Sequence, residues 1–341
     1  MMSQGATWGE IQVGTAVARP GEVGRGGIPV GNTMAGTPAQ IPVIVVCGAE
    51  PGPVLWLNGA THGDEPEGPW SILMTLEELQ PQAMRGAVVA VPAVNVNAFA
   101  AGTRGDPLDT FAYDLNRVYP GSPSGRATER VAHAHISAML SCCDLAITVH
   151  SGGDHSYLCP TIFAPETPAC LELAAAMGPD WPLIMKAFLG SDLTAPLVKA
   201  GKAAINVELG GQCCTLPREF DRICKTLSRS YLNVMRHYGM LPGTVEHCHT
   251  WMYGQQKAIL ANFTGLWVAE PSIEFGSKVP KDTVLGHIRD LYGDVLETVK
   301  APDEGVVFGL RTRPSVRIGD WVCFFGLIEG VREDLGPASP S

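Results

Sequence analysis

Four side chains that could bind a metal ion, or work beside one, follow the ends of three expected strands. His62 and Glu65 come just after the apolar run VLWLN, His150 directly follows LAITV, and Glu208 lies near the end of AINVEL. In an open α/β sheet the carboxyl ends of the strands meet at one rim, where ligands and catalytic groups gather. We therefore expect these four side chains to converge on one site.

Two histidines and one carboxylate, with a fourth position left open, form a typical catalytic zinc ligand set. A histidine and a glutamate three residues apart in a turn can both reach one ion, and the third ligand then comes from another strand. Zinc lowers the pKa of a bound water to about 7, and a further carboxylate must take its proton. Glu208 suits that role. The spacing alone also allows Asp64 or Glu67, which flank Glu65, as the carboxylate ligand.

A long loop at 98–125 supplies cations. It contains Arg104 in AGTRGDP and Arg117 in DLNRVYPG, and Asn116 adds an uncharged donor. A guanidinium matches a carboxylate or stabilises an oxyanion, and loops of this length are usually functional. These residue types are what a hydrolase of small anionic amides needs, although an ion pair between Arg117 and Asp114 is the structural alternative.

Composition narrows the class of protein. The 341 residues carry a net charge of -10 without a basic run, which disfavours a nucleic-acid or anionic-membrane partner. We find neither a run of about 18 apolar residues nor a signal-peptide pattern, so we expect no membrane helix and a cytoplasmic location. The ten cysteines include the pairs Cys142–Cys143 and Cys213–Cys214 but no C-x-x-C, and we expect reduced, mostly buried thiols.

Strands alternate with helices up to about residue 245, after peripheral strands in 1–40, and this pattern predicts an α/β sheet that is at least partly parallel, with helices on both faces. The expected strands are 41–46, 54–58, 87–91, 145–149 and 204–209, and the expected helices are 66–79, 126–140, 167–177 and 217–238.

The pattern then changes to short strands with turn signals, and we expect no helix there. These strands are 265–269, 284–288, 296–300, 305–308 and 321–325, followed by a frayed tail at 331–341. We therefore predict two domains: a catalytic α/β domain with an N-terminal β extension at 1–245, and a small all-β domain at 246–335. The string ETVKAPDEGVV resembles a biotinyl or lipoyl-like barrel without the M-K-M of a carrier, which favours a shielding or assembly role.

Four motifs in order, HGDE, DLNR, a later histidine and VELGG, resemble the succinylglutamate desuccinylase and aspartoacylase family, which is related to the zinc carboxypeptidases. The resemblance covers most of the chain. It implies a doubly wound mixed sheet of zinc-carboxypeptidase type with a C-terminal all-β barrel-like domain. The resemblance also implies that His62, Glu65 and His150 bind zinc and that Glu208 is the general base that shuttles the proton. By the same resemblance Arg104 polarises the scissile carbonyl, and Asn116 with Arg117 binds a substrate carboxylate.

The expected reaction is zinc-dependent hydrolysis of the N-acyl amide bond of a small N-acylated amino acid, and the resemblance suggests N-acetyl-diaminobutyrate as one substrate. A metallocarboxypeptidase acting on short peptides could use the same ligands. A non-catalytic zinc or small-molecule binding protein would not need Glu208 beside an open metal position. Ser151 follows His150 and could suggest a serine hydrolase, but that class is disfavoured because no G-x-S-x-G occurs in the chain.

Other residues keep alternative interpretations. His247 and His249 could form a second metal pair if they lie on a strand, but a solvated linker is the simpler interpretation. His155 lies near the expected site and could tune specificity. Relatives place a substrate-contacting residue from the β domain near the site, and Tyr253 and Tyr292 are candidates here. The Gly- and Pro-rich N-terminal segment could pair across a dimer, which makes a homo-oligomer a further prediction.

Overall fold

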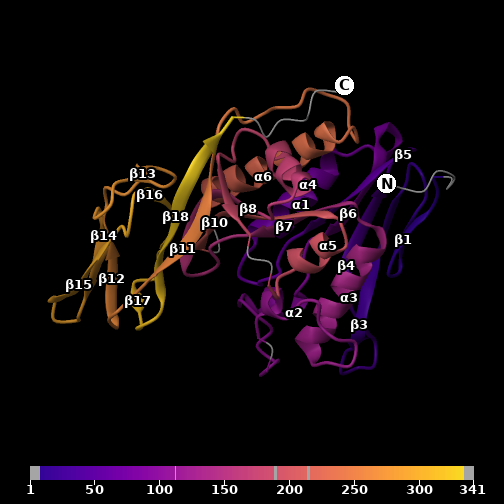
Figure 1. Cartoon of the computed structure of the whole chain (residues 1–341). Coiled ribbons are helices and arrows are strands. Elements are labelled where there is room, and N and C mark those ends of the chain that lie inside the picture. The colour runs from indigo at the N-terminus through magenta and orange to yellow at the C-terminus, as the bar shows by residue number, and fades with distance from the viewer. Residues whose placement is uncertain (1–7, 112, 188–189, 213–215, 334–341) are drawn as a thin grey trace.

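A twelve-stranded mixed sheet runs through the whole molecule (Figure 1). The computed structural model describes residues 8–111, 113–187, 190–212 and 216–333. From edge to edge the strands are β13 (Lys278–Val279), β16 (Gly305–Arg311), β18 (Trp321–Arg332), β11 (Trp251–Leu260), β9 (Leu183–Lys186), β8 (Ser156–Ala164), β10 (Ala203–Gly211), β7 (Leu145–His150), β5 (Glu50–Asn58), β6 (Arg85–Val91), β4 (Pro38–Cys47) and β3 (Val23–Asn32).

The centre of this sheet is parallel, since β10, β7, β5 and β6 run in the same direction. These strands are near-continuous apolar runs, as expected for strands that are covered on both faces. Strand β8 is antiparallel to β10, so the sheet is mixed. The carboxyl ends of β5, β7 and β10 lie next to one another at one rim.

Helices cover both faces of the sheet, as the sequence predicts (Figure 1). On one face lie α1 (Glu67–Glu78), α4 (Pro168–Ala176) and α6 (Pro217–His237), whose apolar side chains pack with alternate residues of the strands, such as Leu57 and Ile147. On the other face lie α3 (Ala127–Cys142) and α5 (Thr194–Lys199), which pack against the opposite series, such as Trp56 and Ala146.

The chain after residue 245 forms only strands and loops in its described part. Strands β11, β16 and β18 extend the central sheet, and β16 also pairs with β8. A separate four-stranded sheet consists of β15 (Val295–Lys300), β14 (Val284–Arg289), β12 (Gly265–Ala269) and β17 (Ser315–Val316). The boundary between two domains at 245/246 stays a prediction, because the central sheet continues across it.

At the N-terminus, the hairpin of β1 (Ile11–Val13) and β2 (Ala16–Ala18) packs on the same core as β3 and β4. Its pairing across a dimer stays a prediction.

Several expectations about single elements were wrong. The loop at 98–125 begins inside α2 (Val96–Ala101) and contains the short 3-10 helix η2 (Leu115–Arg117). We did not predict β8, β9, β11 or α5, which are short or interrupted by polar residues. Residues 331–332 belong to β18 and not to a tail, and 334–341 lie outside the described residues.

Six of the eight cysteines that the structure describes are buried, as expected, whereas Cys213 and Cys214 lie outside the described residues. Their redox state stays a prediction. No helix in the described part of the chain is long and apolar enough to cross a membrane.

Candidate active site

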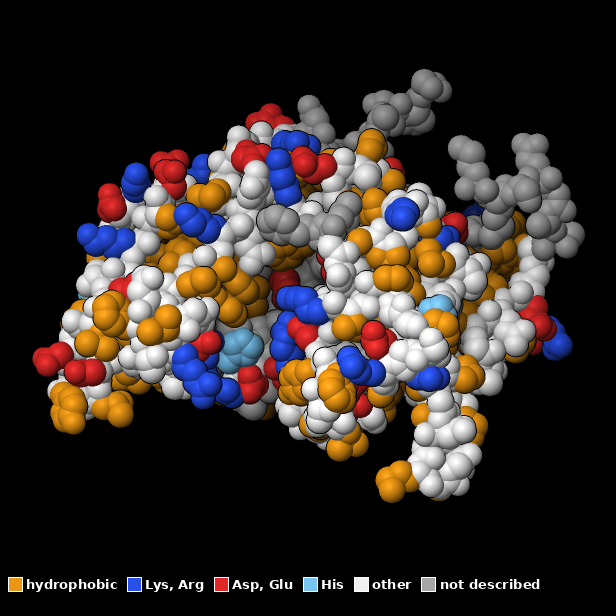
Figure 2. All heavy atoms as spheres, turned by 60° about the horizontal axis from the view of Figure 1, so that its bottom comes forward, with side chains coloured by type: hydrophobic (Ala, Val, Ile, Leu, Met, Phe, Trp, Pro, Cys, Tyr) orange, Lys and Arg blue, Asp and Glu red, His pale blue; other side chains and the backbone are white. Residues whose placement is uncertain are grey.

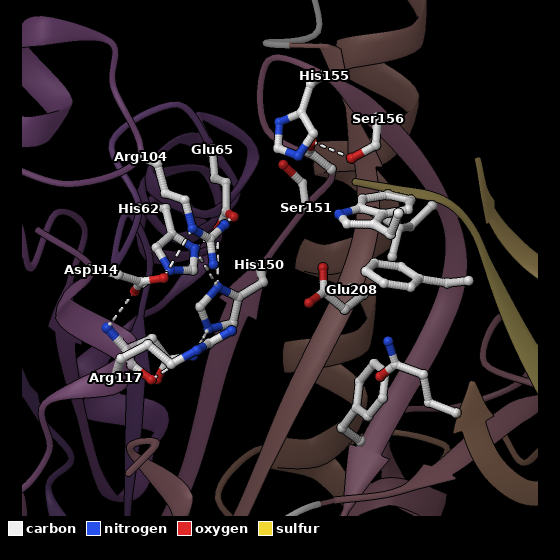
Figure 3. Close-up of a pocket in the computed structure, with 17 residues that line it drawn as sticks. His62, Glu65, Arg104, Asp114, Arg117, His150, Ser151, His155, Ser156 and Glu208 are labelled. Atoms are coloured by element: carbon white, nitrogen blue, oxygen red, sulfur yellow. Dashed lines mark hydrogen bonds and ion pairs between the residues drawn. The ribbon is translucent and has the colours of Figure 1, made fainter. Parts of the chain in front are cut away.

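Three side chains, those of His62, Glu65 and His150, meet at the rim of the parallel strands and form a group that could hold a metal ion (Figure 3). We call these three residues the metal-ligand group. His62 and Glu65 lie in the turn between β5 and α1, and His150 is the last residue of β7. The Glu65 carboxylate lies between the two rings, with Oε1 2.7 Å from Nδ1 of His62 and Oε2 3.0 Å from Nδ1 of His150. Each of the three residues is only 3% exposed.

The turn that carries His62 is held close to the backbone of α2. A Cβ atom on Gly63 would lie 2.0 Å from the carbonyl carbon of Ala98, so only glycine fits at this position. The amide of Gly63 donates to the carbonyl of Arg104 over 3.4 Å. The HGDE turn is therefore fixed against the segment that carries Arg104, one of the two arginines that line the site.

Of the three neighbouring acids, Glu65 is the one between the two imidazoles, and Asp64 and Glu67 lie outside this group. Asp64 accepts a hydrogen bond from the amide of Asp154. Glu67 is fully buried and accepts hydrogen bonds from the Ser151 hydroxyl and the Gly211 amide, over 2.8 and 2.9 Å. Burial raises the pKa of Glu67 to about 7. Glu67 thus connects the ends of β7 and β10.

Asp114 supports the outer side of the first histidine. Its Oδ1 lies 3.1 Å from Nε2 of His62, and its Oδ2 accepts from Nε of Arg104 over 3.0 Å. Burial works to raise the pKa of Asp114, but the hydrogen bond with His62 and the charges of His62, Arg104 and Arg117 hold it well below its usual range. A histidine that donates from Nε2 to a carboxylate keeps its Nδ1 lone pair directed at the metal position. The sequence indicated Asp114 only as a partner of Arg117, although its place in DLNR was a signal.

Asn116 and Arg117 lie on η2 and line the same cavity. The Asn116 side chain is 3.5 Å from Nε2 of His150, and its oxygen accepts from the Leu193 amide over 3.3 Å. Arg117 donates to the backbone carbonyl of Asn116 over 3.0 Å. Figure 3 shows Arg104 and Arg117 on the same side of the cavity as the metal-ligand group.

Glu208 faces this group from β10 (Figure 3). In the sheet register it lies level with His150. Its Oε2 is buried and has no hydrogen-bond partner among the described residues. Burial raises its pKa well above the ordinary value, and the charge of Glu65 adds to this effect while Arg104 opposes it. A carboxyl with a raised pKa beside a metal-ligand group is suited to proton transfer.

The cavity has a volume of about 510 Å³, and Figure 2 shows it as a hollow bordered by basic and acidic side chains. Strands β11 and β18 supply Gln256, Trp321 and Phe324 to its wall, and sequence reasoning missed all three. Neither Tyr253 nor Tyr292 lines it.

Four other histidines differ in whether they lie at the cavity: His155 does, whereas His135, His247 and His249 do not. His155 lines the cavity, with its ring 5.8 Å from that of Trp321. His135 is buried and is a packing residue 2.9 Å from the Tyr119 hydroxyl. His247 and His249 lie outside any strand and outside the metal-ligand groups found among the described residues.

A mixed α/β sheet with a His–Glu–His group that could hold a metal ion at the rim of its parallel strands is suited to metal-assisted hydrolysis. The model of the succinylglutamate desuccinylase/aspartoacylase catalytic domain matches residues 51–238. The chain therefore belongs to the succinylglutamate desuccinylase/aspartoacylase family and is an amidohydrolase that acts on N-acylated amino acids.

Known relatives resemble the chain over most of their length. It is 28% identical over 324 residues to an N-alpha-acetyl-L-2,4-diaminobutyric acid deacetylase from Halomonas elongata, which covers 91% of each chain. The product-bound ectoine utilization protein EutE (DoeB) from Ruegeria pomeroyi is 26% identical with a TM-score of 0.78, covering 89% of this chain and 94% of that one. A succinylglutamate desuccinylase/aspartoacylase from Rhodobacter sphaeroides is 26% identical with a TM-score of 0.77, covering 96% and 99%. These likenesses confirm the predicted fold class.

Proposed function

We propose that this protein is a zinc-dependent deacetylase that removes the acetyl group from the α-nitrogen of 2,4-diaminobutyrate. The observation that carries the proposal is the His62–Glu65–His150 group facing Glu208 across a cavity of about 510 Å³. A cavity of this volume suits a molecule the size of an acylated amino acid. The choice of substrate is supported by the Halomonas elongata deacetylase, which matches over 91% of both chains.

The donor set fits zinc. Two imidazole nitrogens and one carboxylate are the ligands of many catalytic zinc sites. Asp114, at the outer nitrogen of His62, supplies the support that metal-binding histidines usually have. When bound, the ion would acidify a water and polarise the acyl carbonyl.

Glu208 takes the proton of the attacking water and gives it to the amine nitrogen as the carbon–nitrogen bond breaks. Its raised pKa allows it to hold this proton between the two steps. The Arg104 guanidinium stabilises the negative charge that develops on the acyl oxygen. Arg117, with the amide of Asn116, binds the substrate's α-carboxylate. The products are acetate and a free amino acid.

The test combines metal analysis with turnover. The wild type and Glu208→Gln should each bind about one equivalent of zinc, because Glu208 is not a ligand. The variant should lose about 10²- to 10⁴-fold in kcat on Nα-acetyl-2,4-diaminobutyrate, because a general base contributes that much. Glu274→Gln, on the exposed surface, is the matched control.

Acetyl, succinyl and aspartyl substrates should be compared in the same assay. Succinyl preference would contradict the substrate assignment and leave the deacylase intact. A wild type without zinc, or a Glu208→Gln variant with full activity, would contradict the proposed mechanism.

A further inference from the structure

A second cavity opens beside the metal-ligand group and extends the catalytic cavity. Its volume is about 380 Å³, and the two cavities share Asn116, Arg117, His150, Phe163, Glu208 and Gln256. A substrate with its amide at the metal-ligand group and its carboxylate at Arg117 would extend its amino-acid side chain into this space. We call it the side-chain pocket, and the polar side chains that line it but not the catalytic cavity are those of Ser191, Asp192 and Asn206.

Asn206 lines the side-chain pocket from β10. It lies two residues before Glu208, so both side chains leave the same face of the sheet. In the register it is level with Phe163 of β8, which lines the same pocket. The Asn206 Oδ1 atom is buried and has no hydrogen-bond partner among the described residues. Buried acceptors without a partner are rare in folded proteins, so this atom is suited to accept a hydrogen bond from a ligand.

Asp192 supplies a negative charge to the same pocket. Its Oδ1 accepts from the Thr194 hydroxyl over 2.8 Å and from the Ala195 amide over 3.0 Å, which fixes the side chain at the start of α5. Its Oδ2 accepts no hydrogen bond from the part of the chain that the structure describes. One carboxylate oxygen therefore holds the position, while the other is available to a ligand.

The charges favour a cation in the part of this pocket outside the catalytic cavity. Arg117 is the one Lys or Arg among the described residues that line the pocket, and it also lines the catalytic cavity. The pocket also offers the Asp192 carboxylate, the Asn206 amide and the aromatic side chain of Phe163. An ammonium group needs acceptors and a counter-charge, and its methylene stem packs on apolar surface.

We propose that the side-chain pocket binds a protonated amine at the end of the substrate's side chain, with Asp192 and Asn206 as its acceptors. The inference rests on the proposed function, since the side chain enters this pocket only if the acyl amide lies at the metal-ligand group. It assigns the enzyme's preference for a diamino acid to two residues outside the catalytic set.

The experiment compares two substrates of nearly equal shape. Nα-acetyl-2,4-diaminobutyrate ends in an ammonium, and Nα-acetylnorvaline has a methyl group in the same place. The wild type should prefer the cationic substrate at least about tenfold in kcat/KM, a typical effect of one well-placed charge pair. Asp192→Asn keeps the Oδ1 acceptor that holds α5 but removes the charge, so the ratio of the two kcat/KM values should fall about tenfold.

Asn206→Leu, which has a similar shape and no acceptor, should lower the same ratio. The matched control is Asp221→Asn, an exposed position on α6 paired with Lys225, and it should leave the ratio as in the wild type. Calorimetric binding of the products, 2,4-diaminobutyrate against norvaline, reads the same preference without turnover.

The outcomes separate the two proposals. Equal cleavage of both substrates by the wild type would overturn the inference and leave the deacylase intact, as would equal losses on both substrates in Asp192→Asn. If no N-acylated amino acid is cleaved, the proposed function fails. The product-binding ratios of wild type and variant then decide whether the side-chain pocket reads a charge.

Discussion

Replacement of Asp114 by asparagine should weaken zinc binding without changing any ligand. Asp114 Oδ1 lies 3.1 Å from Nε2 of His62, and Oδ2 lies 3.0 Å from Nε of Arg104. Asparagine keeps the shape of the side chain but has no charge and only one acceptor oxygen. Either His62 or Arg104 must then lose its acceptor, because the new amide donates where an oxygen had accepted.

The size of the effect follows from this shared position. Carboxylates that support a metal-binding histidine are worth about 10- to 100-fold in metal affinity. The Asp114 side chain is 21% exposed and divides its charge between two donors, so solvent and Arg104 weaken its effect on His62. We therefore expect a loss near the lower end, about tenfold, which corresponds to about 1.4 kcal/mol.

Competition with a chromophoric zinc chelator measures this affinity directly. Asp221→Asn is the control for an Asp-to-Asn change on the surface, and thermal unfolding of the metal-free proteins shows whether the variant remains folded. If Asp114→Asn holds zinc within about twofold of the wild type, the hydrogen bond to His62 does not orient that ligand and the reasoning is wrong.

Two further predictions concern the buried side chains of His135 and Glu67, neither of which belongs to the metal-ligand group. Burial lowers the pKa of His135 to about 3, so the unfolded chain binds a proton below about pH 6.5 that the folded chain does not. The free energy of unfolding therefore falls as the pH falls, and His135 accounts for about 1.4 kcal/mol of this loss between pH 7.5 and 5.5. Urea unfolding of His135→Gln over this range should lack that contribution. Equal dependence of the unfolding free energy on pH in the wild type and the variant would contradict the prediction. Glu67→Ala leaves the Ser151 hydroxyl and the Gly211 amide without their acceptor and should cost about 1–3 kcal/mol of unfolding free energy. Glu67→Gln keeps one acceptor and should cost less, and equal losses in the two variants would show that these hydrogen bonds are not what matters.

The convergence of His62, Glu65, His150 and Glu208 was predictable because each follows or ends a strand with a strong apolar signal. Parallel strands that are covered on both faces are continuous apolar runs, and their carboxyl ends meet at one rim. The alternation of strands with helices predicted a partly parallel sheet with helices on both faces. The resemblance to the family rested on the order of four motifs along the chain.

Asp114 could not be assigned in the same way. It lies near Arg117 in sequence, and an ion pair between those two was the structural alternative to substrate binding by Arg117. The structure gives it Arg104 and His62 instead, because the loop after α2 folds back over the turn that carries Gly63. A choice among partners across a loop depends on tertiary packing, which residue types and spacing do not encode locally.

The far wall of the cavity was unpredictable for a related reason. Strand β8, SYLCPTIFA, has polar residues and a proline, so its periodicity does not indicate a strand. Yet β8 pairs with β10, β9 and β16, and these pairings carry Trp321 and Phe324 of β18 to the cavity. Without β8 the sequence could not place Trp321 and Phe324 at the cavity, and Gln256 was missed because it lies on β11, which was not predicted either.

Under the proposed function, the chemistry and the choice of substrate use partly different residues. The metal-ligand group and both arginines come from strand ends and loops before residue 151, whereas Asp192 and Asn206, which line only the side-chain pocket, come from the loop before α5 and from β10. Glu208 and Asn206 lie two residues apart on β10, where Glu208 lines both cavities and Asn206 lines only the side-chain pocket. Under the proposed function, a change of side chain at 206 should alter the choice of substrate without replacing the base at Glu208, because the two residues lie on the same face of β10 at separate positions. Substitutions at 192 and 206 would therefore adapt one hydrolytic site to different amino acids while leaving the metal-ligand group unchanged.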